Sequence, residues 1–187
     1  QPRCRPVTDH QSPRAMPALI LPYRSLRPQL DPGAFVAETA TVIGDVVVGA
    51  DSSLWYGCTV RGDVNRIRIG ARTNIQDGTV IHVDSGPFST HIGDDVTVGH
   101  NAVIHACTLK NRAFVGIAAT VLDGAVIEEG GMLAAGGLLT PGKIIGPGEL
   151  WTGSPAKLRR VMDAEEQEKF ARNARVYRDL AAQFRSK

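Results

Sequence analysis

The sequence predicts an all-β solenoid, a parallel β-helix of hexapeptide repeats, followed by a C-terminal α-helix. Two observations carry the β-helix: aliphatic residues recur every six positions, and glycines directly follow several of them. A period of six fits neither the 3.6-residue turn of an α-helix nor a heptad. In a β-helix each short strand turns one aliphatic side chain inward, and three strands make a coil of about 18 residues. The aliphatic positions in phase are Val36, Val42, Val48, Leu54, Val60; Ile69, Ile75, Ile81; Ile92, Val98, Ile104; Val115, Val121, Ile127, Leu133, Leu139, Ile145 and Trp151.

The glycines that follow inward aliphatic residues support the same phase, because close turns and tight backbone packing exclude side chains there. They are Gly49, Gly70, Gly93, Gly99 and Gly116. A sandwich of short strands also contains frequent Gly and Val. Its strands, however, do not keep one phase over seven consecutive positions, so the β-helix is the better interpretation.

The repeat is interrupted three times. Val60 and Ile69 lie nine residues apart, Ile81 and Ile92 eleven, and the step from Ile104 to Leu109 is one residue short. Insertions in a repeat usually form loops on one side, which is often the functional side. We therefore expect functional groups near these interruptions.

The chain divides into four segments on this pattern. Residues 1–16 form a basic, Pro-rich stretch, which we interpret as a disordered tail, a leader or a vector-derived segment, with a transit peptide as an alternative. Residues 17–34 lead into the β-helix of residues 35–155, and residues 156–187 form the C-terminal helical segment, in which the helix is predicted from Asp163 to about Phe184. Asp163 and Glu166 have the spacing of a capping box.

The C-terminal helix is expected to pack on the flank of the β-helix. An apolar stripe is the reason for this expectation, and it needs an apolar partner. Its predicted members are Met162, Phe170, Val176, Leu180 and Phe184.

Composition narrows the class of partner. The formal net charge is +2, aromatic residues make up 5%, and no basic and aromatic platform is visible, so nucleic acid is not an expected partner. No apolar stretch approaches the roughly 20 residues that span a bilayer. Cys4, Cys58 and Cys107 are odd in number and lack CxxC spacing, which argues against a disulfide framework and a thiolate zinc site. A reducing, cytoplasmic location is expected.

Three histidines fall at positions that the repeat makes meaningful. His82 and His105 each follow an inward aliphatic residue on the same face of the prism, one coil apart. They should stack at about 4.8 Å and point outward, where two imidazoles can share one metal ion. His100 lies on the adjacent face, so within its own chain it points away from this pair.

A neighbouring chain can supply the missing ligand. If the His100 face of one subunit packs on the His82 and His105 face of the next, the contact closes as a threefold ring. Gln76 lies one coil from His100 and would reach the same site. Three histidines around a tetrahedral ion leave one position for water, as in catalytic zinc sites. His10 and His91 are interpreted as solvated residues without a role in this site.

The sequence resembles γ-class carbonic anhydrases over residues 18–187. The resemblance rests on RGDVNRIRIGARTNIQDGTVIHV from Arg61, IGDDVTVGHNAVIHAC from Ile92 and GELWTGSPAKLRR near the end. It implies a left-handed β-helix homotrimer with zinc, or iron or cobalt, at each subunit interface. It also implies a lyase that hydrates carbon dioxide to bicarbonate.

The resemblance also implies roles for individual residues. By the family motif, the metal ligands are His82, His100 and His105. Gln76 would orient the metal-bound water, with Asn74 nearby, and Tyr177 would shape the mouth of the pocket. The charged residues implied at the subunit interface are Arg61, Asp63 and Asp77.

The sequence departs from the family in three places. Val64 stands where the archaeal prototype of the family has Glu. The short loop after His82 replaces an acidic loop and contains Asp84 as its only acid. The proton released by the reaction would therefore leave through Asp84 or through buffer. Ile117 and Ala118 replace part of a Gly-Met-Gly run and would narrow the pocket. Two alternatives stay open: a metal-dependent acyl-CoA thioesterase, and a catalytically weak trimeric assembly subunit.

Overall fold

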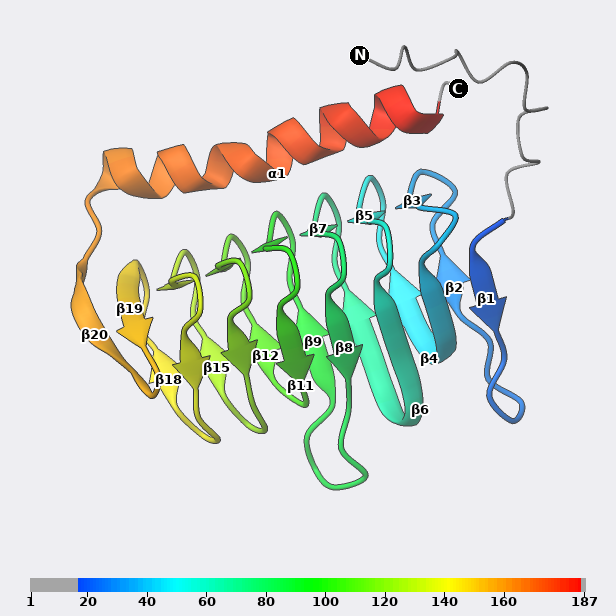
Figure 1. The fold of residues 1–187 in the computed structure, drawn as a ribbon, viewed down its shortest axis with the longest axis horizontal. Helices are drawn as coiled ribbons and strands as arrows, with labels where there is room; N and C mark the ends of the chain where they lie inside the picture. Colours follow the sequence, from blue (N-terminus) through cyan, green and yellow to red (C-terminus); the bar gives the residue numbers. More distant parts are fainter. Residues whose placement is uncertain (1–16, 186–187) are drawn as a thin grey trace, which may run out of the picture.

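The chain forms a parallel β-helix with one long helix laid along it (Figure 1), which confirms the predicted fold class. The computed structural model describes residues 17–185, so the predicted tail, residues 1–16, lies outside the described residues. β-strands stack in parallel with register offsets of 17 to 23 residues, about one coil each. Three flat faces result, named below by what they carry.

The helix face carries the C-terminal helix, and the histidine face carries His82 and His105. The third face, called the outer face, carries neither the helix nor these two histidines. The helix face contains β3 (Phe35–Val36), β5 (Ser53–Leu54), β7 (Asn74–Ile75), β10 (Thr97–Val98), β13 (Phe114–Val115), β16 (Met132–Leu133) and β19 (Glu149–Gly153). The histidine face contains β8 (Val80–His82), β11 (Val103–His105), β14 (Thr120–Val121) and β17 (Leu138–Leu139). The outer face contains β9 (Thr90–Ile92), β12 (Thr108–Leu109), β15 (Val126–Ile127) and β18 (Ile144–Ile145).

Two longer strands, β4 (Thr41–Val48) and β6 (Thr59–Ile69), turn a corner and belong to both the histidine face and the outer face. The short strands β1 (Leu19–Leu21) and β2 (Gln29–Leu30) pair with β4, so the predicted lead-in of residues 17–34 already adds to the sheet.

The predicted inward positions form the core. Leu54, Ile75 and Val98 follow one another in register on the helix face, and each is fully buried. Ile81 and Ile104 do the same on the histidine face. Close stacking explains the glycines as well, since a Cβ on Gly70 would lie 2.6 Å from the backbone carbon of Gly93. The six-residue period therefore sets both the core and the coil spacing.

The interruptions of the repeat have different outcomes. The first, residues 61–68, does not form a loop as expected: β6 continues through the corner, because Ile67 pairs with Val46 and adds another buried aliphatic residue. The second forms a loop between β8 and β9 that protrudes below the coils in Figure 1. In the third, Ala106 adopts a φ of 46°, which closes the corner with one residue fewer.

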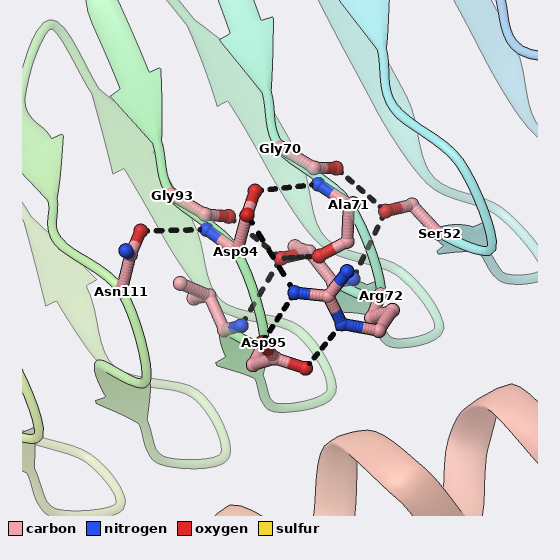
Figure 2. A network of polar contacts seen from close by, with 10 residues as sticks. Ser52, Gly70, Ala71, Arg72, Gly93, Asp94, Asp95 and Asn111 are labelled. Atoms are coloured by element: carbon pink, nitrogen blue, oxygen red, sulfur yellow. Dashed lines mark hydrogen bonds and ion pairs between the residues drawn. The ribbon is translucent and has the colours of Figure 1, made fainter.

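A polar network joins successive coils at the corner between the outer face and the helix face (Figure 2). Asp94 Oδ1 accepts a hydrogen bond from the Ala71 amide at 2.8 Å, and Asn111 Oδ1 accepts one from the Asp94 amide at 2.9 Å. Arg72 binds both carboxylate oxygens of Asp95, at 2.8 and 2.7 Å. Side chains thus satisfy turn amides that the strand ladders leave free.

The helix predicted from Asp163 to about Phe184 is confirmed, but a strand that was not predicted precedes it. Residues 156–161 form strand β20 (Ala156–Val161), which returns antiparallel along β19, and α1 (Ala164–Arg185) starts only afterwards. The predicted capping box is confirmed: Asp163 Oδ1 accepts from the Glu166 amide at 2.9 Å, and Glu166 reaches back to the Asp163 amide at 3.4 Å. The capping residue, rather than the end of the repeat, sets the start of α1.

Helix α1 packs on the helix face, as predicted. Phe170 meets Phe114 of β13 with ring centroids 5.2 Å apart, and Phe184 meets Phe35 of β3 at 5.9 Å. One predicted stripe residue is wrong: Val176 is 58% exposed. The stripe runs through Phe170, Ala174, Tyr177, Ala181 and Phe184, whose spacings of three and four keep them on one side of a helix. No helix in residues 17–185 has the length and hydropathy needed to cross a membrane.

Candidate metal centre

His82 and His105 stack as the sequence predicts. They are register partners on β8 and β11, and their ring centroids lie 5.2 Å apart. His82 Nδ1 and His105 Nε2 face each other at 3.2 Å. Thr90 Oγ1 donates to the His82 carbonyl at 2.7 Å, which fastens the start of β9 to the end of β8 across the loop. Backbone pairing alone therefore brings two ring nitrogens together.

Each of these rings has a carboxylate on its other nitrogen. His82 Nε2 lies 2.9 Å from Asp63 Oδ1, and His105 Nδ1 lies 2.5 Å from Asp123 Oδ1. We assign the N–H of each ring to the nitrogen that faces the carboxylate, because an ionised carboxylate can only accept. The nitrogens that face each other then both present lone pairs.

Two lone pairs at 3.2 Å repel unless a cation lies between them. Zinc binds imidazole nitrogen at about 2.0–2.1 Å with tetrahedral geometry, which places two ligand nitrogens about 3.3–3.4 Å apart. The donor atoms, their spacing and their carboxylate partners therefore fit a metal ion. Carboxylates behind ligating histidines fix the tautomer and orient the ring.

Asp123 was missed by the sequence reasoning. It lies one coil after His105, displaced by one position along the chain, so its carboxylate reaches the distal nitrogen. The sequence offered a partial signal, an acid about one coil length after a candidate ligand, but the register of β11 and β14 places Leu122 rather than Asp123 beside His105.

His100 lies in the turn after β10, at the edge of the helix face, and therefore away from the pair, as expected. Its Nδ1 is 2.9 Å from Asp77 Oδ2, and its Nε2 is 3.4 Å from the hydroxyl of Tyr177 on α1. Burial raises the pKa of Tyr177, and the Asp77 carboxylate raises it further, so the phenol keeps its proton and can donate. His100 thus repeats the pattern of the other two: one nitrogen is fixed by a carboxylate, and the other keeps its lone pair.

Gln76 and His100 line one cavity of about 340 Å³, which Tyr177 also borders. The orientation of Gln76 is fixed by buried neighbours. Gln76 Nε2 donates to Asn74 Oδ1 at 3.0 Å, and Asn74 Nδ2 donates to Thr97 Oγ1 at 2.9 Å. Because the amide nitrogen is used in this way, Gln76 Oε1 is left as an acceptor.

Asp63 joins two side chains through its two oxygens: Oδ1 faces His82, and Oδ2 accepts from Arg61. Partial burial acts to raise the pKa of Asp63, but the hydrogen bonds from His82 and Arg61 outweigh it and hold the pKa below its usual value. Within one chain, Asp63 and Asp77 both orient histidines; the interface role expected for Arg61, Asp63 and Asp77 stays a prediction.

The remaining predicted residues lie around the site. Asp84 lies in the loop after β8, where Oδ2 accepts from the Gly86 amide at 3.0 Å. Ile117 is exposed and lines the cavity beside His100. Ala118 occupies the following turn with a φ of 55° and donates its amide to the His100 carbonyl. Across residues 17–185 of one chain, no three His, Cys, Asp or Glu side chains converge as a metal-binding group.

Comparisons with known proteins place the chain. No protein-family model matches it. A protein named carbonic anhydrase from Geobacillus kaustophilus is 43% identical over 159 residues, covering 85% of this chain and 87% of that protein. The chain belongs to the γ-carbonic anhydrase family. Gamma carbonic anhydrase 2, mitochondrial, from Arabidopsis thaliana is 50% identical over 82% of this chain, and its own name carries the γ class.

A solved structure supports the hexapeptide-repeat fold. A protein described as a hexapeptide transferase family protein, from Anaplasma phagocytophilum, matches with a TM-score of 0.84 and 48% identity, over 89% of this chain and 98% of that one. The γ-carbonic anhydrase relatives from Arabidopsis are longer, and the chain spans 57 to 62% of their length.

Proposed function

We propose that this γ-carbonic anhydrase family member is a zinc enzyme that hydrates carbon dioxide to bicarbonate, with each zinc held between two subunits of a homotrimer. The facing lone pairs of His82 and His105, 3.2 Å apart, are the observation that carries the proposal. Catalytic zinc sites use three protein ligands and one open position. Two stacked histidines fall one short, and His100 of a neighbouring subunit would supply Nε2, which would exchange its 3.4 Å contact with the Tyr177 hydroxyl for the metal.

The surface around the pair suits a subunit contact. Val80 and Val103 are register partners beside the two histidines, and they are 42% and 37% exposed. Aliphatic side chains that stand together on a flat β-sheet face favour burial against another chain. A head-to-tail contact between this face and the edge of the helix face closes after three subunits when each contributes a 120° step.

Bound zinc would supply Lewis acidity that gives water a pKa near 7 and makes hydroxide available at neutral pH. The chain's own residues would do the rest. The carboxylates of Asp63, Asp77 and Asp123 would each orient one histidine ring, so that its unprotonated nitrogen is available to the metal. Gln76 Oε1 accepts a hydrogen bond from the reacting water and so directs a lone pair of that water towards carbon dioxide.

Removal of the proton is assigned to Asp84, the acid of the loop that begins next to His82. Its Oδ2 accepts from the Gly86 amide in a local turn, so the carboxylate would need to exchange this contact to collect a proton. Buffer provides the competing route, which makes the contribution of Asp84 dependent on buffer concentration.

The first experiment measures mass by light scattering and zinc by elemental analysis, for the wild type and for His100→Ala. The wild type is expected to be a trimer with one zinc per chain, and His100→Ala should lose zinc while keeping its circular dichroism spectrum. A monomer that retains zinc, or an unchanged zinc content in His100→Ala, would overturn the shared site.

Mixed trimers test the sharing directly. His82→Ala lacks one ligand of the stacked pair, whereas His100→Ala lacks only the ligand offered to the neighbour. Each variant alone should bind little zinc, but refolding them together should restore about a quarter of the sites, because random mixing pairs the two intact halves at that frequency. No recovery would place all ligands in one chain.

Stopped-flow hydration of carbon dioxide tests the reaction, on zinc-loaded and on anaerobically iron-loaded protein. Activity that disappears in His82→Ala is the expected result. A fully metallated trimer that does not hydrate carbon dioxide would overturn the assigned reaction while leaving the metal site intact.

A further inference from the structure

The outer face carries a basic groove that the metal centre does not use. It has a volume of about 480 Å³ and is lined by side chains of β6, β9 and β12 and by the corner residues that follow them. Arg68, His91 and Thr108 stand in register on three successive coils at its wall. His91, set aside in the sequence analysis, is thus part of a row of polar groups.

Two corner glycines line the groove without side chains. Gly70, Gly93 and Lys110 occupy equivalent positions in successive coils, as their amides show by donating to Ile92, Leu109 and Ile127 in turn. The first two coils have no side chain there, and the third has lysine. Lys110 is therefore the residue that carries a side chain at this position of the groove wall, because a Cβ on Gly70 or Gly93 would clash with the next coil.

Among the residues that the structure describes, one of the four basic side chains around this groove is paired with an acid, and the other three are not. Arg68 pairs with Asp45 at 2.7 Å, whereas Arg66, His91 and Lys110 form no ion pair with any residue in the range 17–185. The pKa of His91 lies below its usual value because partial burial disfavours its charged form and because Arg66, Arg68 and Lys110 repel a further positive charge. The His91 imidazole therefore lies in the positive field of three neighbouring side chains.

Uncharged donors complete the lining. The amide nitrogens of Gly70 and Gly93 are used within the coil ladder. Thr108 Oγ1 and Asn111 Nδ2 have no partner among the described residues, since Asn111 uses only its oxygen, towards the Asp94 amide. A ligand here would meet side-chain N–H and O–H donors and positive charge, which is the chemistry that recognises an oxyanion.

We propose that this groove binds a phosphate-type oxyanion, either free or as the phosphoryl group of a small metabolite, between Arg68, His91 and Lys110. Bound anion would offset the repulsion among the cations and draw a proton onto His91. The site is separate from the candidate metal centre, because none of its lining residues forms a side-chain hydrogen bond or ion pair with His82, His100 or His105. Packing of the histidine face on the helix face in the proposed trimer would leave it accessible.

Sulfate is the probe for the first test, because it stays dianionic between about pH 5 and pH 7, a range that extends below the usual histidine pKa of about 6.5, as the lowered pKa of His91 requires. Calorimetry on the wild type should show saturable binding that is several-fold tighter at the lower pH. Lys110→Met should weaken sulfate binding about tenfold, the effect of losing one charge-assisted contact. Lys157→Met, which removes an exposed lysine from β20, is the matched control and should bind as the wild type does.

His91→Gln keeps a polar side chain and should bind sulfate with the same affinity at both pH values. Ribose 5-phosphate, compared with inorganic phosphate at about pH 8, separates the two sources: tighter binding of the ester indicates a metabolite, and equal binding indicates free anion. Three results would overturn the site: no saturation by about 20 mM sulfate, equal losses in Lys110→Met and Lys157→Met, or a pH dependence that survives in His91→Gln.

Discussion

Asp123→Asn tests how a carboxylate behind a histidine supports metal binding. Asp123 Oδ1 lies 2.5 Å from His105 Nδ1, so the substitution replaces a charge-assisted hydrogen bond with a neutral one of similar shape. Loss of such a partner typically lowers metal affinity 10- to 100-fold, or about 1.4–2.7 kcal/mol. The side chain of Asp123 is 40% exposed, and solvent weakens the contact, so we expect a value near the tenfold end.

Zinc affinity is measured by competition with a chromophoric chelator at neutral pH. Asp179→Asn is the control, because Asp179 pairs only with Arg178 on the exposed side of α1. It should leave zinc affinity unchanged, and both variants should unfold at the wild-type temperature in the presence of EDTA. Equal zinc affinity in Asp123→Asn and Asp179→Asn would refute the idea that Asp123 holds the ring of His105 for a metal.

Four further predictions concern the rest of the chain. Burial raises the pKa of the Cys58 and Cys107 thiols to about 12, so both should react slowly with a thiol reagent until the protein unfolds. The thiols ionise near pH 9 in the unfolded chain and near pH 12 in the folded protein, so their contribution to the free energy of unfolding should be fully present below pH 9 and should fall as the pH rises towards 12. Urea denaturation should show a smaller fall in a Cys58→Ala, Cys107→Ala double variant. Asp163→Ala should cost about 1 kcal/mol of unfolding free energy through loss of the helix cap, measured in the same way. Ile104→Ala, at a fully buried position, should cost about 2–5 kcal/mol, and a loss below 1 kcal/mol would show that the coil collapses around the cavity. Asp84→Asn should lower kcat in dilute buffer but not in concentrated imidazole; equal rates in dilute buffer would remove Asp84 from the proton path.

The coil architecture could be predicted because one period controls it. Each inward aliphatic residue lies one coil from the next on its face, so Ile81 and Ile104 fixed the places of His82 and His105 directly. The position of His100 on another face followed from the same count. The three histidines proposed as metal ligands are the part of the site that the repeat itself encodes.

Contacts that depend on how far a side chain extends could not be predicted from the six-residue period of the sequence. Asp123 does not share the register position of His105, and its role appears only when the ring and carboxylate are placed in three dimensions. The corner through residues 61–68 was expected to be a loop, but buried Ile67 extends β6 across it. β20 was missed because its exposed residues show no inward pattern; pairing with the edge of β19 makes it a strand.

The same repeat explains why the two sites of this chain differ in kind. Each corner turns the chain onto a new face, so the side chains of residues a few positions apart, such as His100 and His105, point to different sides of the coil. A site that needs both therefore requires a second chain. Residues one coil apart stand side by side, as Arg68 and His91 do, and can form a site within one chain. The proposed metal centre should therefore depend on protein concentration through trimer formation, whereas the proposed anion groove should not. Dilution below the trimer dissociation constant would separate the two, with zinc released and sulfate affinity retained.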